Sequence, residues 1–185
     1  MLKFSPKRLN IKTECGIFLL LFIFFVTAGL IIAHTTVAAE EKGPGLEITE
    51  SVIMGYLYPE DPEEVHDYRY VTEDVLFMDM ATGQPMATNR EELAAGLDYI
   101  YNVAFDVEEI RGMKLLTGNG EAALEWTLVG THTGEFAGIP ATGRNVEFPI
   151  IARYELQEEY PHHIKEARIY IMMNILMDQL LAGGE

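Results

Sequence analysis

Apolar residues recur with two different spacings along this chain. Over residues 46–58, and again after residue 88, they return every three or four positions, which predicts amphipathic helices. The second helix opens with Thr88-Asn89-Arg90-Glu91, a capping-box sequence in which Thr88 and Glu91 satisfy free backbone donors. The later part of the chain predicts strands over 107–116, 122–133, 146–157 and 164–174, with an earlier short strand over 75–78. Helices followed by a meander of strands are typical of an α+β fold.

Side chains alternate across a strand, so odd and even positions assign the two faces of the predicted sheet. Ala122, Leu124, Trp126 and Leu128 share one apolar face, and His132 joins it if the strand stays regular. Tyr154 belongs to the apolar face of the next strand. In the last strand, one face carries Glu166, Arg168, Tyr170 and Met172, and the opposite face carries Ile169 and Ile171.

The first 39 residues differ in kind from the rest. Four basic residues precede the uncharged apolar run 17–33, and the small residues Val37-Ala38-Ala39 follow it. This pattern predicts an export signal cut after Ala39. A run of 17 residues also reaches the lower limit for crossing a bilayer, so an uncleaved membrane anchor is the alternative. We expect a signal or anchor over 1–39, a linker over 40–45 and one exported domain, periplasmic or secreted, over 46–185.

Charge and cysteine content exclude several kinds of function. The formal net charge of −16 repels phosphate backbones, so we expect no nucleic-acid partner. The lone cysteine, Cys15, precedes the apolar run and leaves the domain without a disulfide or a thiolate metal site. His162 and His163 are adjacent on a predicted turn, where two side chains seldom converge on one ion, so we expect no metal. The sequence has no glycine-rich phosphate loop, and we expect no cofactor.

Residues 130–144 carry the most specific motif, Gly-Thr-His-Thr-Gly-Glu-Phe-Ala-Gly-Ile-Pro-Ala-Thr-Gly-Arg. It resembles the hairpin signature GTHTGEFxGIPPTGR of SnoaL-like polyketide (ester) cyclases, a branch of the nuclear-transport-factor-2-like folds, with Ala141 in place of one proline. Residues 70–77 and Gln179-Leu180 are similar to two further family segments. The resemblance covers about 46–181. It implies a cone-shaped, curved antiparallel sheet wrapped by N-terminal helices, a pocket between them, and a homodimer.

The resemblance also implies where chemistry takes place. The family's last strand reads approximately I-x-E-x-W-x-x-x-D, and the alignment places Met172 on its catalytic Asp and Arg168 on its aromatic position. A thioether cannot exchange a proton, so the usual aldol cyclisation is not expected here. The nearest acidic residues are Asp79 and Asp178. The predicted catalytic residues are Asp79, His132 and Tyr170, and the predicted ligand contacts are Trp126, Tyr154, Arg168 and Met172.

Two functions remain open from the sequence. One is an enzyme of the cyclase or isomerase kind that moves a proton on a small apolar carbonyl compound. The other is a non-catalytic binder of an apolar small molecule, or a dimeric interaction module. Several of the named residues also have structural interpretations: His132 as a residue that shapes the turn, and Arg168 as the partner of Glu166.

Overall fold

The computed structural model describes residues 43–61 and 64–182. Its contacts divide the chain into two compact units, Met1–Val37 and Ala38–Glu185, and the described residues belong to the second. The predicted signal or anchor over 1–39 lies outside the described residues. No helix in the described part of the chain is long and apolar enough to cross a membrane.

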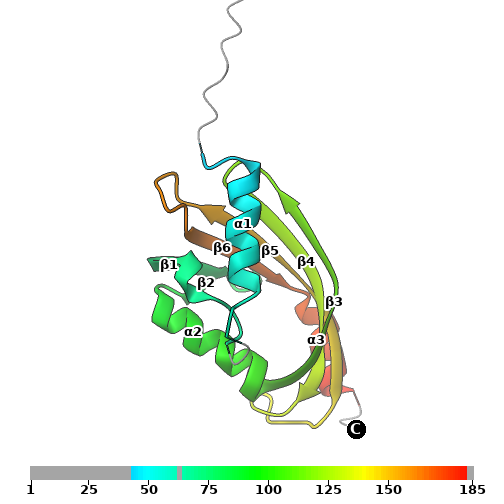
Figure 1. The fold of residues 1–185 in the computed structure, drawn as a ribbon. Coiled ribbons are helices and arrows are strands. Elements are labelled where there is room, and N and C mark those ends of the chain that lie inside the picture. The colour runs from blue at the N-terminus through cyan, green and yellow to red at the C-terminus, as the bar shows by residue number, and fades with distance from the viewer. Residues whose placement is uncertain (1–42, 62–63, 183–185) are drawn as a thin grey trace, which may run out of the picture. The chain divides into compact units, whose positions relative to one another are not determined.

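The described domain is built from helices around one sheet (Figure 1). The helices are α1 (Leu46–Leu57), a 3-10 turn (Tyr68–Tyr70), α2 (Arg90–Asp98), a π-helical stretch (Tyr99–Ala104) and α3 (Met173–Leu181). The strands are β1 (Val71–Asp79), β2 (Gln84–Ala87), β3 (Phe105–Thr117), β4 (Glu121–His132), β5 (Asn145–Leu156) and β6 (Ile164–Ile171). They form one sheet in the order β2-β1-β6-β5-β4-β3.

The α+β class is confirmed, but the prediction of a purely antiparallel sheet is wrong. Strands β3 to β6 form the expected antiparallel meander, whereas β1 pairs with β6 in parallel. A hairpin turn forces neighbouring strands to run in opposite directions, but β1 and β6 are separated by most of the domain. The sheet is therefore mixed. It curves strongly, with α1 and α2 on the same side of it (Figure 1).

The core lies on the side of the sheet that α1 and α2 cover. Alternate residues of β4 and β5 are buried there, as the sequence predicts, from Leu124, Trp126 and Leu128 to Phe148, Ile150 and Tyr154. Helix α1 adds Val52, Ile53 and Tyr56 to this core. Fully burying a large apolar side chain stabilises a fold by about 1.5–3 kcal/mol. A slip of one residue in strand pairing would turn these side chains to the other face of the sheet, so their alternation specifies the register.

Element boundaries depart from the sequence prediction at three places. Residues 84–87, expected in a loop, form edge strand β2 against β1. The last strand ends at Ile171, and Met172 is the N-cap of α3. Asn89, and not Thr88, caps α2: its side chain accepts the Glu92 N–H at 2.9 Å, while the Glu92 carboxylate accepts the Thr88 N–H at 2.8 Å. The predicted capping box is therefore displaced by one residue, because extended Asn89 is better placed to accept from the first turn.

The hairpin motif at 130–144 holds the start of β3. The N–H groups of Thr133 and Gly134 both donate to the Ala104 carbonyl, at 2.9 and 3.1 Å. A Cβ at position 134 would lie 2.5 Å from the Val103 carbonyl oxygen, so only glycine allows this approach. At the other end of the motif, the Arg144 guanidinium donates to the Gln179 carbonyl at 3.2 Å.

Replacing Gly55 by alanine tests how tightly α1 packs on the rest of the domain. A Cβ at Gly55 would lie 2.3 Å from the ring of Tyr70, so we expect Gly55→Ala to lower the free energy of unfolding by about 1–3 kcal/mol. Gly96→Ala in α2 is the matched control, because a Cβ added at Gly96 would meet no other part of the chain within 4 Å. This substitution should raise the free energy of unfolding by about 0.5–1 kcal/mol. Urea unfolding measures both. Equal stability of the two variants would contradict the packing described for α1.

Candidate functional site

A cavity of about 350 Å³ lies between the helices and the inner face of the sheet. Its walls include Leu57 of α1, Leu97 of α2, and Leu124, Ile150 and Ile169 of the sheet. The volume falls at the lower end of the roughly 300–1,000 Å³ typical of small-molecule sites. The curvature of the sheet and the incomplete cover of the short helices leave this space open.

The polar groups of the cavity are all uncharged at neutral pH. They are the side chains of Tyr56, Tyr58, His66, Tyr101, Trp126 and Tyr154. None of the described residues that line the cavity is Asp, Glu, Lys or Arg. A ligand that carries a charge would therefore enter this space without a partner of opposite charge, which is costly in an apolar environment.

His66 is the one lining residue whose side chain ordinarily titrates near neutral pH. Its ring stacks on Tyr56, with the ring centroids 4.4 Å apart, and meets the edge of Tyr101 at 6.0 Å. Burial lowers the pKa of His66 from 6.5 to about 4, against a smaller opposing effect from a backbone hydrogen bond with Tyr56. His66 is therefore neutral at pH 7. Its Nδ1 is buried and has no hydrogen-bond partner among the described residues.

Tyr56, Tyr101 and Tyr154 of the cavity remain protonated over the whole physiological range. Burial raises the pKa of Tyr101 to about 12, although the nearby Trp126 side chain opposes this by hydrogen bonding. Burial also raises the pKa values of Tyr56 and Tyr154. All three hydroxyls can therefore donate a hydrogen bond at pH 7.

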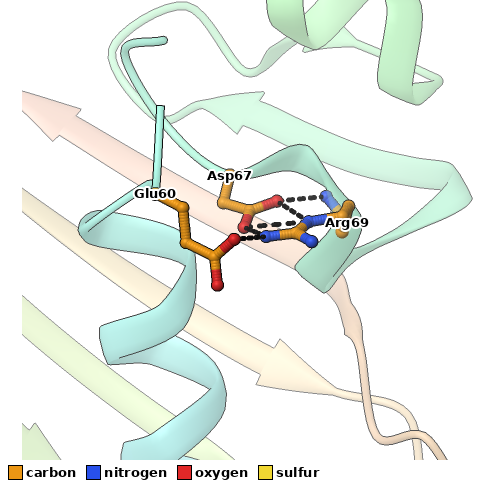
Figure 2. A network of polar contacts seen from close by, with 3 residues as sticks. All are labelled: Glu60, Asp67 and Arg69. Atoms are coloured by element: carbon orange, nitrogen blue, oxygen red, sulfur yellow. Dashed lines mark hydrogen bonds and ion pairs between the residues drawn. The ribbon is translucent and has the colours of Figure 1, made fainter. Parts of the chain in front are cut away.

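A charged network outside the cavity fixes the segment that carries His66 (Figure 2). The guanidinium of Arg69 donates to both carboxylate oxygens of Asp67, at 2.9 and 2.6 Å, and lies 3.5 Å from the Glu60 carboxylate. The Asp67 N–H donates to the Tyr56 carbonyl at 2.9 Å. These bonds join the end of α1 to the turn before β1. Bidentate pairing with Arg69 lowers the pKa of Asp67, which is 3 % exposed.

The family model for SnoaL-like polyketide cyclases matches residues 59–180, which is well over half of the chain. The chain belongs to this family. The match covers α2 and all six strands of the described sheet, and it confirms the resemblance based on the hairpin motif. No curated protein matches the chain.

Solved structures agree with this family assignment. A putative SnoaL-like polyketide cyclase from Jannaschia sp. CCS1 aligns with a TM-score of 0.61 and 16% identity, over 76% of this chain and 96% of that one. A putative polyketide cyclase from Xanthomonas campestris pv. campestris aligns with a TM-score of 0.59 and 16% identity, over 72% of this chain and 97% of that one. AclR, a putative hydroxylase from Streptomyces galilaeus, aligns with a TM-score of 0.56 and 17% identity, over 73% of this chain and 96% of that one. At these identities the likeness shows a shared fold, and proteins of differing description share it.

Of the residues predicted to form the site, Trp126 and Tyr154 line the cavity of this SnoaL-like domain. The other predicted ligand contacts, Arg168 and Met172, lie outside the lining. Arg168 donates to Glu166 at 2.7 Å and its side chain is 42% exposed. The cavity side of β6 carries Ile169 and Ile171 instead, because from Ala167 onward β6 turns its odd-numbered residues to the core. Met172 follows the strand and its N–H donates to the Pro149 carbonyl.

The predicted catalytic residues Asp79, His132 and Tyr170 do not meet in the cavity. Asp79 ends β1, and its carboxylate accepts from the Ala81 N–H at 2.8 Å and the Thr82 hydroxyl at 2.7 Å in the turn that follows. His132 is fully buried beneath the hairpin. Tyr170 shares the outward face of β6 with Arg168 and is 39 % exposed.

His132 holds the two ends of the hairpin together. Its Nδ1 accepts from the Thr142 N–H at 3.2 Å and lies 3.0 Å from the Thr142 hydroxyl. Because Nδ1 accepts, the neutral ring carries its proton on Nε2, which has no partner among the described residues. The geometry is that of a residue that shapes the turn.

The sequence patterns do not identify His66, Tyr56 and Tyr101 as residues of the site, although all three line the cavity. His66 lies in a short irregular segment, and neither its spacing nor a motif distinguishes it. Tyr56 and Tyr101 belong to the apolar stripes of two helices, and such tyrosines fill cores in most proteins. Within residues 43–61 and 64–182, no group of three or more His, Cys, Asp or Glu side chains could hold a metal ion.

The lowered pKa of His66 predicts how stability changes with pH. Between pH 4 and 6.5 the unfolded chain binds a proton that folded His66 does not, so stability falls as the pH is lowered through this window. The loss is at most about 3 kcal/mol. His66→Phe keeps a ring against Tyr56 but cannot titrate, and we expect a smaller pH dependence of the free energy of unfolding.

Urea unfolding at a series of pH values measures this dependence. Asp67 does not affect this measurement, because its pKa is lowered from 3.8. The stability that ionised Asp67 contributes is therefore lost only below the pH window in which His66 acts. His132 and His163 also have lowered pKa values and remain in the variant. The pH dependence of stability in His66→Phe should therefore be smaller than in wild type but not zero. An unchanged dependence in His66→Phe would show that His66 is not buried as described.

Proposed function

We propose that this protein binds a small, uncharged and mostly apolar compound in the cavity between α1, α2 and the sheet. The observation that carries the proposal is the lining of that cavity, where apolar and aromatic side chains surround a few uncharged polar groups. Such a lining is the usual composition of a small-molecule site. Membership of a family of polyketide cyclases supports a ligand with a carbon skeleton of that kind.

We place binding ahead of the family's cyclisation for a chemical reason. Proton abstraction beside a carbonyl needs a titratable base within reach of the substrate. No carboxylate of the described residues lines the cavity. The motif resemblance also suggests that Met172 takes the place of the family's catalytic Asp. The aligned position also lies outside the lining.

One observation favours a second function, proton transfer on a carbonyl compound. His66 lines the cavity, is neutral at pH 7, and lies beside the hydroxyl-bearing rings of Tyr56 and Tyr101. A base whose pKa lies near 4 is weak, yet such bases serve where hydroxyl donors stabilise the enolate oxygen. Exchange of the α-protons of 1-tetralone in D₂O tests this function. Exchange that wild-type protein accelerates and His66→Phe does not would establish it, and no acceleration would leave binding alone.

We also propose, from the sequence, that the protein is exported and forms a homodimer. Export follows from the basic residues, the uncharged run 17–33 and the small residues before Glu40. Homodimerisation is carried over from the family. The intact mass of purified protein distinguishes a cleaved signal from a retained anchor.

Filling the cavity tests the binding proposal. We expect fluorene, an uncharged aromatic hydrocarbon, to raise the melting temperature of the wild-type domain, since a ligand that binds only the folded state stabilises it. Leu97→Trp places an indole in the cavity and should weaken fluorene binding at least tenfold. Leu116→Trp is the matched control, since Leu116 is 62 % exposed and outside the lining. Equal binding by both variants would place the fluorene site elsewhere.

A further inference from the structure

Two of the described residues that line the cavity are exposed to solvent, and these two contact each other. Tyr58 is 58% exposed and Met113 is 41% exposed, whereas the rest of the described lining is buried or half-buried. The Tyr58 hydroxyl donates a hydrogen bond to the Met113 sulfur at 3.4 Å. This contact joins the end of α1 to β3. The exposed side of the cavity is therefore the side on which these two side chains meet.

Tyr58 is held in place by the end of α1. It is the C-cap residue of the helix, and its N–H donates to the Met54 carbonyl at 3.0 Å. Pro59 follows, and a proline has no N–H with which to continue the helix. The backbone therefore leaves the helix at Tyr58, directly after Leu57, which also lines the cavity.

A β-bulge in β3 precedes Met113. The pairing of β3 with β4 shifts between Arg111 and Lys114, where two residues of β3 face one residue of β4. The extra residue is accommodated at Gly112, whose φ of 64° is a conformation that glycine adopts without strain. Bulges re-aim the side chains beside them and are over-represented next to active sites.

The bulge decides which side of the sheet Met113 faces. Before the bulge, Ile110 pairs with Leu128. After it, Leu115 pairs with Leu124, and both partners belong to the buried face of β4. In a regular strand, residues 110 and 115 would lie on opposite faces, because side chains alternate. Met113 lies two residues before Leu115 and shares its face, so the extra residue is what turns Met113 toward the cavity.

A second hollow of about 270 Å³ lies along α2 and is the rival route into the cavity. Met86, Leu97 and Ile100 line both spaces, so a ligand passing between the two spaces would have to part these half-buried apolar side chains. Parting packed apolar side chains forfeits their contacts. The contact between Tyr58 and Met113 costs less to break, because a thioether is a weak acceptor and water can replace it at an exposed site.

We propose that the Tyr58–Met113 contact is the gate through which ligands enter and leave the cavity. This inference rests on the proposed function, since it names the route to the same site. Rotation of the two side chains about their own bonds opens the gate, and methionine suits this role because its side chain is unbranched and has three rotatable bonds. The gate opens and closes without a change in the packing of the sheet.

Met113→Ala tests the gate by removing half of it. The rate constants for association and dissociation of fluorene should both rise about fivefold, while their ratio stays within about threefold, because opening limits entry and exit alike. Stopped-flow fluorescence measures both rates, with Trp126, the only tryptophan of the chain, as the reporter in the cavity wall. Leu116→Ala in the same strand is the control and should match wild type, since Leu116 is 62% exposed and outside the lining.

Glutathione attached at the gate tests the same claim from the opposite direction. Cys15 is the only cysteine of the chain, so Met113→Cys in a Cys15→Ser background offers one thiol for a mixed disulfide. A charged peptide is costly to bury in an uncharged apolar cavity, so it should stay at the rim. It should slow both association and dissociation of fluorene about tenfold or more, and dithiothreitol should restore both rates. Slower release of fluorene loaded before modification distinguishes a blocked gate from an unfolded protein, which would release it faster.

Two further sites carry glutathione for comparison. Modified Leu116→Cys should keep both rates within about twofold of its unmodified form. Gly96→Cys lies in the second hollow and outside the lining of the cavity, and a side chain there meets no other part of the chain within 4 Å. Glutathione at this position obstructs the rival route, and it should leave both rates unchanged.

The outcomes separate the gate from the proposed function. Unchanged rates in Met113→Ala or in modified Met113→Cys would overturn the gate and leave the proposed function intact. Slow binding in modified Gly96→Cys alone would place the entrance at the second hollow and overturn it as well. Failure of fluorene to bind wild-type protein would overturn the proposed function, and this inference with it.

Discussion

The architecture of this domain depends on burying one face of a strongly curved sheet. Every second residue of β4 and β5 is buried, and most of these residues are apolar and must be kept from water. Helices α1 and α2 cover that face, but the cover is incomplete because α2 is a helix of nine residues. The remaining volume is the cavity. The site is therefore a consequence of how this sheet is covered, and its apolar character follows from the same residues that stabilise the fold.

Charge is kept out of the cavity although the chain carries a net charge of −16. On the opposite face of the sheet, acidic and basic side chains pair across and along the strands, as in Arg153–Glu121, Lys165–Glu155 and Arg168–Glu166. Pairs this exposed contribute little to stability. They satisfy the charges of the outer face, to which Arg168 belongs, while the inner face holds uncharged donors.

The sequence predicts the fold better than it predicts the site. Alternation identified the buried faces of β4 and β5 correctly because one face of each strand is apolar and the other is not. In β6 the apolar Ile169 and Ile171 share one face and the charged Glu166 and Arg168 share the other, so alternation alone favours the face that lines the cavity. The family alignment instead directed the site prediction to Arg168, Tyr170 and Met172. The pairing of β1 with β6 lies beyond local pattern, because it joins residues separated by most of the domain.

The most specific motif of the chain and the candidate site occupy different places. The hairpin at 130–144 is held in place by hydrogen bonds to backbone groups, which His132 and Arg144 make with their side chains and Gly134 makes with its N–H. Its sequence is constrained by close contacts, which is why it identifies the family so well. The cavity is lined by His66 and Tyr101, and no local pattern distinguishes them from core residues.

The central claim is that a small, uncharged and mostly apolar compound binds in the cavity between α1, α2 and the sheet. A crystal structure of the domain grown with fluorene tests it most directly. The account predicts the three rings between α1, α2 and the inner face of the sheet, against the side chains that line the cavity. A compound bound instead on the outer face of β6, beside Arg168 and Tyr170, would contradict it.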